Sequence, residues 1–289
     1  MSTASPTLAD LRRRIDELDD ALHELLMERA AVVESVGKLK RADATPPLRP
    51  GREAQILRRL LARHRGPFPK PILVRLWREL LAGSLAIQAE LHIAVHASEK
   101  SAGLWDLARD HYGSHTPMTG FRSTGEVLRA LADGRATLGV LPVPGQGDNV
   151  EPWWRFLAAG EAPVPRIIAR LPFGGRGNAR SDDGDGFVIG AIAPEESGAD
   201  RSLYILETGD DLSRGRLLAA LGNAGLPVNV LAAADGEGSG ATLLVEFDGW
   251  IASDDARLSE ALAGLGGKVR RCTWLGGYAR PLSAAELAE

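Results

Sequence analysis

The polar residues with the clearest chemical meaning are a few cations and amides on otherwise apolar helical faces. In residues 8–41, two rows of positions at heptad spacing form a seam, and nine of its ten positions are apolar. The tenth position is Arg29. A guanidinium on a buried seam costs several kcal/mol unless an anion or a carboxylate meets it. We therefore expect Arg29 either to be paired inside the protein or to bind an anionic ligand.

Lys40 is the companion of Arg29 on the same predicted helix. It lies eleven positions further along, which is about three turns and within about 20° around the helix axis, so both side chains can lean toward one site. Arg12 cannot join them from the same chain, because 17 residues of helix separate it from Arg29 by roughly 25 Å. If Arg12 serves this site, it must come from a partner chain in an antiparallel dimer.

Two shorter predicted helices add four more candidates, Arg52, Glu53, Ser84 and Gln88. The whole set consists of cations and neutral hydrogen-bonding groups with a single acid. It contains no nucleophile beside a base and no histidine, which disfavours covalent catalysis and an acid–base relay. Such a set can clamp a small dianion and stabilise negative charge that develops on an oxygen.

Three amphipathic helices within the first 92 residues must position these side chains. Prolines and glycines interrupt the chain at 41–51 and 66–71, which predicts helices at 8–41, 52–64 and 72–91. The buried seam expected for the third helix consists of Leu73, Leu76, Leu80, Ile87 and Leu91. The first helix would be about 50 Å long at 1.5 Å per residue, too long for one short domain to cover. We therefore expect an all-α domain that completes its core with a second copy of itself.

From residue 92 onward the sequence changes to an α/β pattern. Short strand-like runs alternate with helical stretches, and residues 174–186 form a polar, glycine-rich loop or hairpin. Residues 201–281 are predicted to form strand, helix, strand, strand, helix and strand, which is the ferredoxin-like order. We expect domains at residues 1–92, 93–196 and 197–289.

Composition narrows the class of protein. The chain of 289 residues is 44% hydrophobic and 25% charged, which is ordinary for a soluble globular protein. Its apolar runs are far shorter than the roughly 18 residues of a membrane span, and its N-terminus lacks an apolar signal core, so we expect a cytoplasmic protein without membrane contact. One cysteine and six scattered histidines favour neither a disulfide nor a metal site.

The net charge of −4 conceals an asymmetry between the two parts of the chain. Residues 1–92 contain 16 Lys and Arg against 12 Asp and Glu, and the remainder is acidic. A basic helical part suits an anionic small molecule, although a solvated helix surface also explains most of these charges. Because there is no long basic run and no interleaving of aromatic with basic residues, we expect no nucleic-acid partner.

The motifs LRRRIDELD, LLMERAAVVESVGKLK, RPGREAQIL and GSLAIQ closely resemble those of the all-helical chorismate mutases over about residues 8–92. The resemblance implies an intertwined homodimer of three-helix chains that rearranges chorismate to prephenate without a cofactor. Arg12 would come from the other subunit to one substrate carboxylate, and Arg29 would bind a carboxylate within the chain. Lys40 and Gln88 would donate hydrogen bonds to the ether oxygen.

The remaining site residues also follow from the resemblance. Glu53 would hold the ring hydroxyl of the substrate, while Arg52 and Ser84 would line the pocket. One position departs from the family pattern, because members often have an acid three residues before the position of Arg52, where this chain has Arg49. The second contact to the ring hydroxyl is therefore in question.

Residues 92–282 resemble the dehydratase and regulatory ACT regions of the bifunctional chorismate mutase/prephenate dehydratases, but the motifs that carry chemistry differ. The Thr-Arg-Phe motif of that family is replaced by Asp185-Gly186-Phe187, and its Pro-Ile-Glu-Asn stretch by residues 142–145, Pro-Val-Pro-Gly. The stretches associated with phenylalanine binding are replaced at residues 213–216 and 232–235. We expect a dehydratase-like α/β region and an ACT-like ferredoxin fold that have lost dehydratase activity, with a possible site for a small-molecule effector.

Two alternatives remain open at this point. The first is a fully bifunctional enzyme in which other residues perform the dehydration. The second is a non-catalytic dimer that senses a small molecule through its C-terminal part. The presence of Arg29, Lys40 and Gln88 argues against the second, since a simple dimerisation seam would have leucine or valine at position 29.

Overall fold

The structure is a computed structural model that describes residues 6–97, 102–146, 151–159, 164–180, 184–236 and 240–288. The chain forms two compact units, Met1–Pro47 with Gly83–Glu90, and Leu48–Ala82 with Leu91–Glu289. The first unit contains the long N-terminal helix and the end of the third helix. The second unit contains the second helix, most of the third, and the α/β part of the chain.

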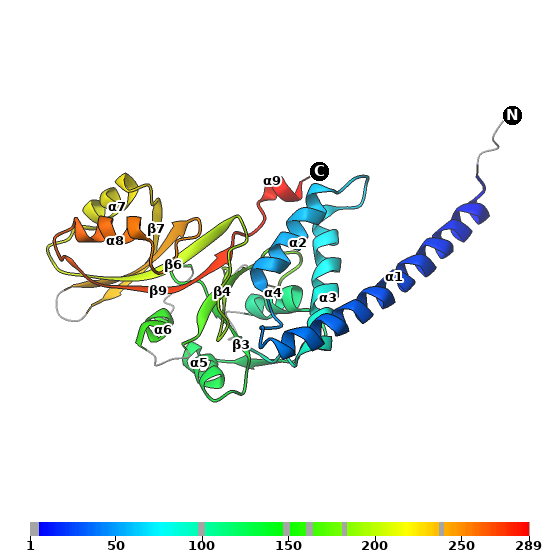
Figure 1. Cartoon of the computed structure of the whole chain (residues 1–289), viewed down its shortest axis with the longest axis horizontal. Helices are drawn as coiled ribbons and strands as arrows, with labels where there is room; N and C mark the ends of the chain where they lie inside the picture. The colour runs from blue at the N-terminus through cyan, green and yellow to red at the C-terminus, as the bar shows by residue number, and fades with distance from the viewer. Residues whose placement is uncertain are drawn as a thin grey trace. The chain divides into compact units, whose positions relative to one another are not determined.

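The N-terminal helix α1 (Leu8–Ala42) confirms the helix predicted at 8–41, and Figure 1 shows it as one unbroken ribbon. Thr7 begins it with a capping box, in which its Oγ1 accepts from the backbone N–H of Asp10 and the Asp10 carboxylate accepts from the N–H of Thr7. Apolar side chains of α1 are exposed within the chain, with 64% exposure at Leu8 and 66% at Leu39. This helix therefore presents an apolar face that its own chain leaves uncovered.

Helices α2 (Pro50–Ala62) and α3 (Lys70–Gln88) confirm the second and third predicted helices. Their buried apolar residues pack together with residues from much later in the chain, and this core consists of Ala54, Leu57, Val74, Leu81, Phe173, Ala279 and Leu282. The buried face of α3 differs from the one expected, because Leu76 and Ile87 are exposed. The later part of the chain covers the face of Val74 and Leu81, which the heptad pattern could not reveal.

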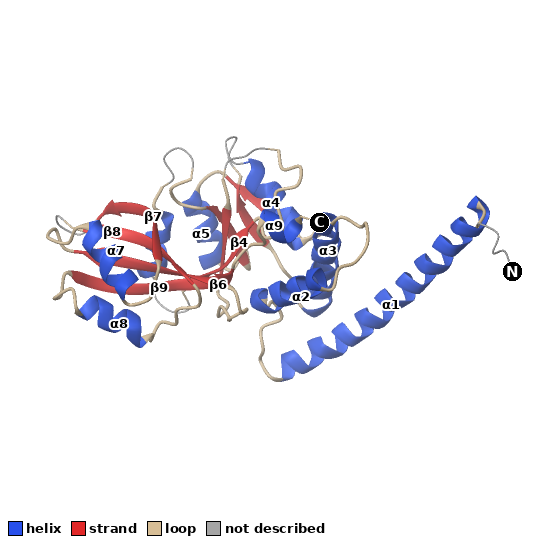
Figure 2. Ribbon diagram, turned by 90° about the horizontal axis from the view of Figure 1, so that it is seen from above, coloured by secondary structure: helices blue, strands red, loops and turns tan. Residues whose placement is uncertain are grey.

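The described strands form one sheet in the order β2-β1-β3-β5-β4-β9-β6-β8-β7. Their bounds are β1 (Ile93–His96), β2 (Met118–Phe121), β3 (Leu138–Pro142), β4 (Arg166–Leu171), β5 (Gly186–Gly190), β6 (Asp200–Thr208), β7 (Val228–Asp235), β8 (Ala241–Asp248) and β9 (Val269–Ala279). Strand β1 is parallel to β2 and β3, whereas β5 is antiparallel to β3 and β4. Helices α4 (Ala102–Tyr112) and α5 (Thr124–Ala132) contact the strands β1 to β4 of this sheet (Figure 2). The short helices η1 (Trp153–Arg155) and α6 (Phe156–Ala159) come next in the chain, before β4.

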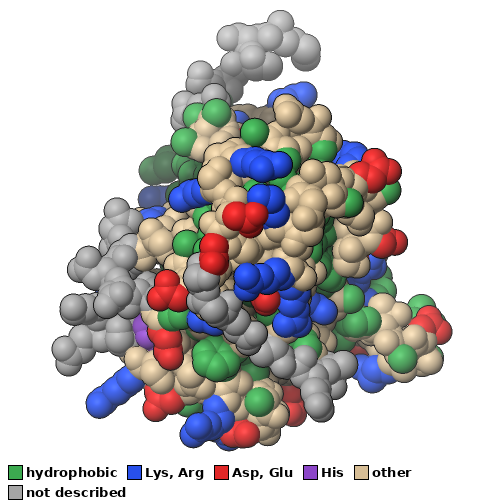
Figure 3. Space-filling model, turned by 90° about the vertical axis from the view of Figure 1, so that its left-hand side faces the viewer, with side chains coloured by type: hydrophobic (Ala, Val, Ile, Leu, Met, Phe, Trp, Pro, Cys, Tyr) green, Lys and Arg blue, Asp and Glu red, His purple; other side chains and the backbone are tan. Residues whose placement is uncertain are grey.

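The C-terminal part confirms the predicted ferredoxin-like order, with α7 (Arg214–Asn223) between β6 and β7 and α8 (Ala256–Ala263) between β8 and β9. Side chains of β6 alternate between the two faces of the sheet, and both faces are buried because each packs in a core of its own. Tyr204 and Leu206 pack in the core shared with α7 and α8, while Leu203 and Ile205 pack in the core of the sheet's other face. On the face of the molecule at this end of the sheet, basic and acidic side chains are interspersed (Figure 3).

The two halves of the sheet join where β4 is parallel to β9, at Ile167 and Gly276. A Cβ on Gly276 would lie 2.2 Å from the carbonyl oxygen of Ile167, and its φ is +133°, so only glycine fits there. The last short helix is α9 (Ala284–Leu287). Within the predicted glycine-rich loop at 174–186, residues 181–183 lie outside the described residues. Among the helices described, none is both long and apolar enough to cross a bilayer.

Candidate functional site

Arg29, the charged residue of the α1 seam, donates a hydrogen bond from Nη1 to the hydroxyl of Ser84 on α3. Partial burial lowers the pKa of Arg29, but a guanidinium remains protonated at any ordinary pH. The structure therefore brings two of the predicted site residues into direct contact. Since Ser84 is neutral, this bond orients the positive charge without neutralising it.

Gln88 lies one turn beyond Ser84 and belongs to the same group of contacts. Its Nε2 donates to the backbone carbonyl oxygen of Ser84 at 2.9 Å, and the backbone carbonyl oxygen of Gln88 accepts from Nη1 of Arg41 at 3.2 Å. A Cβ on Gly37 of α1 would lie 3.0 Å from Cγ of Gln88, so the glycine permits close approach of the two helices. An amide carries two N–H groups, so Gln88 keeps donor capacity beyond this bond.

Lys40 lies three residues after Gly37, in the last turn of α1. Its Nζ donates to the carbonyl oxygen of Pro47 at 2.9 Å, across the loop that follows the helix. Arg12 is exposed near the other end of α1. Because α1 is continuous, the roughly 25 Å between Arg12 and Arg29 is a real separation within one chain. The need for a second chain to supply Arg12 stays a prediction.

Arg52 and Glu53 lie in the first turns of α2, in the second unit. Arg52 is exposed and donates to the amide oxygen of Gln55 at 3.4 Å. The Glu53 carboxylate accepts a hydrogen bond of 2.9 Å from Nη1 of Arg78, a buried residue of α3. Arg78 was not among the candidates from the sequence. Arg78 lies in the row of Val74 and Leu81, and the apolar spacing of α3 alone does not mark that row as buried.

Arg49 occupies the position where chorismate mutases often have an acid, and here it has a structural partner. Its guanidinium bonds both carboxylate oxygens of Glu195, with Nη2 at 2.7 Å from Oε2. Hydrogen bonding to Glu195 raises the pKa of Arg49. A Cβ on Gly51 would lie 2.8 Å from the carbonyl oxygen of Glu195, which shows how closely the start of α2 approaches this segment. The departure from the family pattern thus fastens α2 to a later part of the chain.

Asp185, at the position where the dehydratase family has threonine, is surrounded by arginines. Its carboxylate accepts from Nη2 of Arg170 at 2.8 Å and from Nη2 of Arg176 at 2.9 Å. Arg170 also reaches Glu246, which accepts a hydrogen bond from Tyr278. Burial alone would lower the pKa of Arg170, but Tyr278 and Asp185 outweigh it and raise that pKa. These groups form a network that links β4, β8 and β9 to Asp185, the residue just before β5.

The neighbouring stretch of residues 142–145 is likewise held by packing. The indole N–H of the buried Trp153 donates to the carbonyl oxygen of Pro142 at 3.0 Å. Gly145 has a φ of +82°, and a Cβ there would lie 2.2 Å from the carbonyl oxygen of Leu231. Pro142, Gly145 and Asp185 therefore serve internal contacts of the protein.

The helical segment with this arrangement is similar to a known family: residues 11–89 match the family model described as chorismate mutase type II. This match confirms the resemblance drawn from the motifs of α1, α2 and α3. The bifunctional chorismate mutase/prephenate dehydratase of Pseudomonas aeruginosa is 33% identical over 141 residues, which cover 47% of this chain and 38% of that protein. The bifunctional enzyme of Stutzerimonas stutzeri is 30% identical over the same shares of both proteins.

The aligned region is longer than the family match but spans less than two fifths of the length of these relatives. Among solved structures, the prephenate dehydratase of Arthrobacter aurescens is similar with a TM-score of 0.49 and 14% identity, covering 67% of this chain and 92% of that one. The chain combines a helical segment that matches the chorismate mutase type II model with an α/β part, as expected from the sequence.

Proposed function

We propose that this protein is a chorismate mutase, an isomerase that rearranges chorismate to prephenate in phenylalanine and tyrosine biosynthesis. The observation that carries the proposal is the series of contacts from Arg29 to Ser84 to Gln88, inside the segment that matches the chorismate mutase type II family. The family match suggests the reaction. The contacts supply a cation and an amide donor of the kind that the reaction uses.

This rearrangement requires orientation and charge stabilisation rather than proton transfer. The ether C–O bond of chorismate breaks while a C–C bond forms in the same molecule, so neither a base nor a nucleophile is consumed. The substrate must be held in a compact conformation, and negative charge grows on the ether oxygen. In our proposal Arg29 and an Arg12 from a second copy bind the two carboxylates, and Lys40 and Gln88 donate to the ether oxygen.

Glu53, Arg52 and Ser84 complete the proposed set of substrate contacts. Glu53 accepts a hydrogen bond from the ring hydroxyl of the substrate, while Arg52 and Ser84 line the pocket. The support for Glu53 is the resemblance together with its position on α2, where a hydrogen bond from Arg78 orients the carboxylate. A carboxylate can accept up to about four hydrogen bonds, so the bond to Arg78 does not exhaust it.

A second copy of this chain is the proposed partner of α1. Large apolar side chains are exposed along the helix over most of its length, including Leu11, Ile15, Leu18, Leu22, Leu25 and Val32. Such a face is costly to leave in water and has the heptad spacing of a helix–helix seam. The same pairing would bring an Arg12 to the site of the other chain, so the homodimer and the active site are one proposal.

The α/β part is proposed to lack dehydratase activity. The support is that Asp185 and residues 142–145 are engaged in internal contacts where the related enzymes have their reactive motifs. The C-terminal domain expected at residues 197–289 is proposed to be ACT-like and to bind a small-molecule effector. A cytoplasmic location stays a prediction.

Incubating purified full-length protein with chorismate at neutral pH tests the proposal. The products would be identified by mass and ultraviolet spectrum, without the acid treatment that converts prephenate chemically. We expect prephenate alone. Phenylpyruvate would instead support the second candidate, a bifunctional enzyme, which the names of the curated relatives favour. Unchanged chorismate would overturn the proposed mutase and leave the sensing dimer.

A further inference from the structure

Arg78 of α3 is a buried cation whose ion-pair partner is a proposed substrate residue. Its side chain is only 4% exposed, and Nη1 lies 2.9 Å from Oε2 of Glu53. Burial lowers the pKa of Arg78 and the Glu53 carboxylate opposes that effect. A charge-assisted hydrogen bond of this kind fixes the position of the carboxylate.

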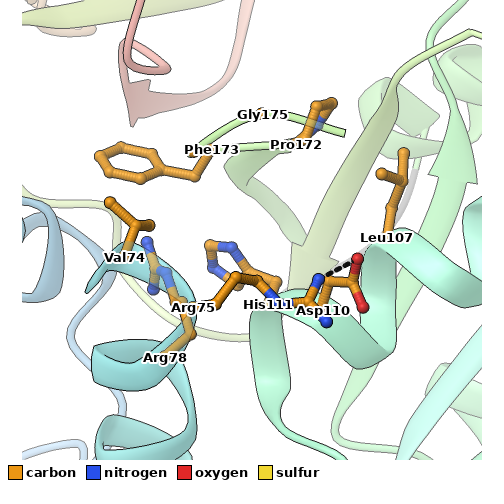
Figure 4. Close-up of a pocket in the computed structure, with 10 residues that line it drawn as sticks. Val74, Arg75, Arg78, Leu107, Asp110, His111, Pro172, Phe173 and Gly175 are labelled. Carbon is orange, nitrogen blue, oxygen red and sulfur yellow. Dashed lines mark ion pairs between the residues drawn. The ribbon is translucent and has the colours of Figure 1, made fainter. Parts of the chain in front are cut away.

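The surroundings of Arg78 come from the part of the chain after residue 91. The guanidinium carbon lies 4.8 Å from the centroid of the Phe173 ring, within the range of a cation–π contact. His111 and Tyr112 of α4 are buried nearby, and burial together with the charge of Arg78 lowers the pKa of His111 well below its ordinary value. His111 is therefore neutral at pH 7 and does not repel the guanidinium. Figure 4 shows His111 and Phe173 around the arginine.

The space beside Arg78 leaves it little freedom. The cavity between α3, α4 and the segment of Phe173 has a volume of about 20 Å³, which is room for about one water molecule. The hydroxyl of Tyr112 is buried, and burial and Glu53 raise its pKa, so it stays protonated. A side chain confined in this way cannot move aside without disturbing α4 and Phe173.

Helix α2 is also held by arginine side chains that bind residues after position 91. Nη2 of Arg58 donates to the carbonyl oxygens of Ala199 at 2.8 Å and Arg280 at 2.9 Å. Arg49 binds Glu195 at the start of the helix. The helix that bears Glu53 is thus held at its start and in its second half by residues outside the segment that matches the chorismate mutase family.

From these contacts we infer that Arg78 is a positioning residue for mutase activity, which acts on substrate through Glu53. The α/β part of the chain, through Phe173 and α4, in turn holds Arg78 in place. This inference rests on the proposed function. It assigns the α/β part a role in the mutase reaction that requires no dehydratase chemistry.

A double-mutant cycle on the full-length chain tests the inference. Chorismate kinetics would be measured for the wild type, Glu53→Gln, Arg78→Gln and the double variant. Misplacement of a substrate contact can cost up to about 10²-fold, so we expect each single change to lower kcat/KM by about tenfold or more. The double variant should be no worse than the poorer single variant, because Arg78 then has no carboxylate to orient. The loss in Arg78→Gln should divide between kcat and KM as it does in Glu53→Gln.

Arg75→Gln provides the matched control. Arg75 lies one turn before Arg78 on α3 and forms an ion pair with Asp110, drawn as a dashed line in Figure 4. It has no contact with Glu53 among those described, so its loss should leave kcat/KM within about twofold of wild type. Arg78→Lys, which keeps the charge without the planar stack on Phe173, should fall between wild type and Arg78→Gln.

If Arg78→Gln does not fold, Phe173→Leu takes its place in the cycle. It removes the ring beneath the guanidinium and should lower kcat/KM by a few fold, again with no further loss when combined with Glu53→Gln. Losses that multiply in the double variant would show that Arg78 acts independently of Glu53 and would overturn the inference. Wild-type kcat/KM in folded Arg78→Gln or Phe173→Leu would do the same. A wild-type protein without mutase activity would overturn the proposed function and this inference with it.

Discussion

The long helix α1 and the sheet differ in how much apolar surface they expose and in what their arginines contact. Along α1, large apolar side chains are exposed within the chain, whereas residues such as Leu203 and Ile205 of β6 are fully buried. Arg29 meets a neutral hydroxyl in Ser84, whereas Arg170 meets the carboxylate of Asp185. The charged groups named in the sheet are paired within the chain. Our proposal assigns the apolar face of α1 to a second chain and Arg29 to an anionic ligand.

The largest effect is expected when Arg29 is replaced with leucine. This change restores an apolar residue to the seam while removing the proposed carboxylate ligand. Mutase activity should fall by about 10²- to 10³-fold, as typically follows loss of a group that stabilises a transition state. Stability should stay equal or increase, because a partly buried charge is removed. Activity assays and thermal unfolding would measure both, and an active Arg29→Leu protein would place the site elsewhere.

Gln88→Glu tests the donor on α3 through pH. A glutamine amide donates at any ordinary pH, so the wild type should show little change in activity from pH 6 to 8. A glutamate donates only when protonated, and its ordinary pKa is about 4.3, so the variant should lose about tenfold in rate for each pH unit above its carboxyl pKa. Rate profiles from pH 4.5 to 8 would show this. Equal activity of the variant at pH 5 and pH 8 would remove Gln88 from the assignment.

Asp185→Ala examines the region that satisfies its own charges. Removing the carboxylate leaves Arg170 and Arg176 without it, and breaking a partly buried pair of this kind should cost roughly 3 kcal/mol of unfolding free energy. Denaturant unfolding would measure the loss. Mutase kcat/KM should stay close to wild type as long as the protein is folded, since the network of Asp185 does not include Arg78 or Glu53. A large loss of mutase activity in the folded variant would contradict a purely structural role.

The smallest effect is expected at the C-terminal tie between Glu286 and Arg280. Hydrogen bonds from Arg280 and Ser283 hold the pKa of Glu286 at about 2, below its ordinary value. A carboxyl whose pKa is lowered on folding contributes stability above its unfolded pKa and loses it as the pH falls from about 4.5 to about 2. Because both side chains are about one third exposed, Glu286→Gln should cost less than about 1 kcal/mol at pH 7. Unfolding at pH 7 and pH 3 should show a smaller difference between variant and wild type at the lower pH.

The order of elements was largely predictable from the sequence. Heptad spacing and proline breaks located the three helices within a few residues, and alternation of strands with helices gave the ferredoxin-like order of the C-terminal part. Strand β2, Met118–Phe121, was not predicted, because four residues with exposed polar positions carry little periodic signal. The exposed row of α3 was also misjudged, since the choice of its buried face depends on residues such as Phe173 that lie far away in sequence.

The candidate site was predictable where residues share a helix or a motif. Arg29 stood out as a charge in an apolar row, and the structure brings it to Ser84 and Gln88. The partner of Glu53 could not be predicted, because Arg78 lies 25 positions away and helical periodicity says nothing about contacts between helices. The arginines around Asp185 were not predicted either, because Arg170 and Arg176 lie 15 and 9 positions away and no local pattern relates them to Asp185.

Mixing two inactive variants tests most directly whether the helical unit builds its site together with a second chain. Arg12→Ala and Arg29→Ala would be purified, shown to be folded and inactive, and then unfolded and refolded together. Random pairing places both variants in about half of the dimers, and one of the two sites in each mixed dimer has both arginines, so about a quarter of wild-type activity should return. Each variant refolded alone should stay inactive. A mixture that remains as inactive as its components would contradict a site shared between two chains.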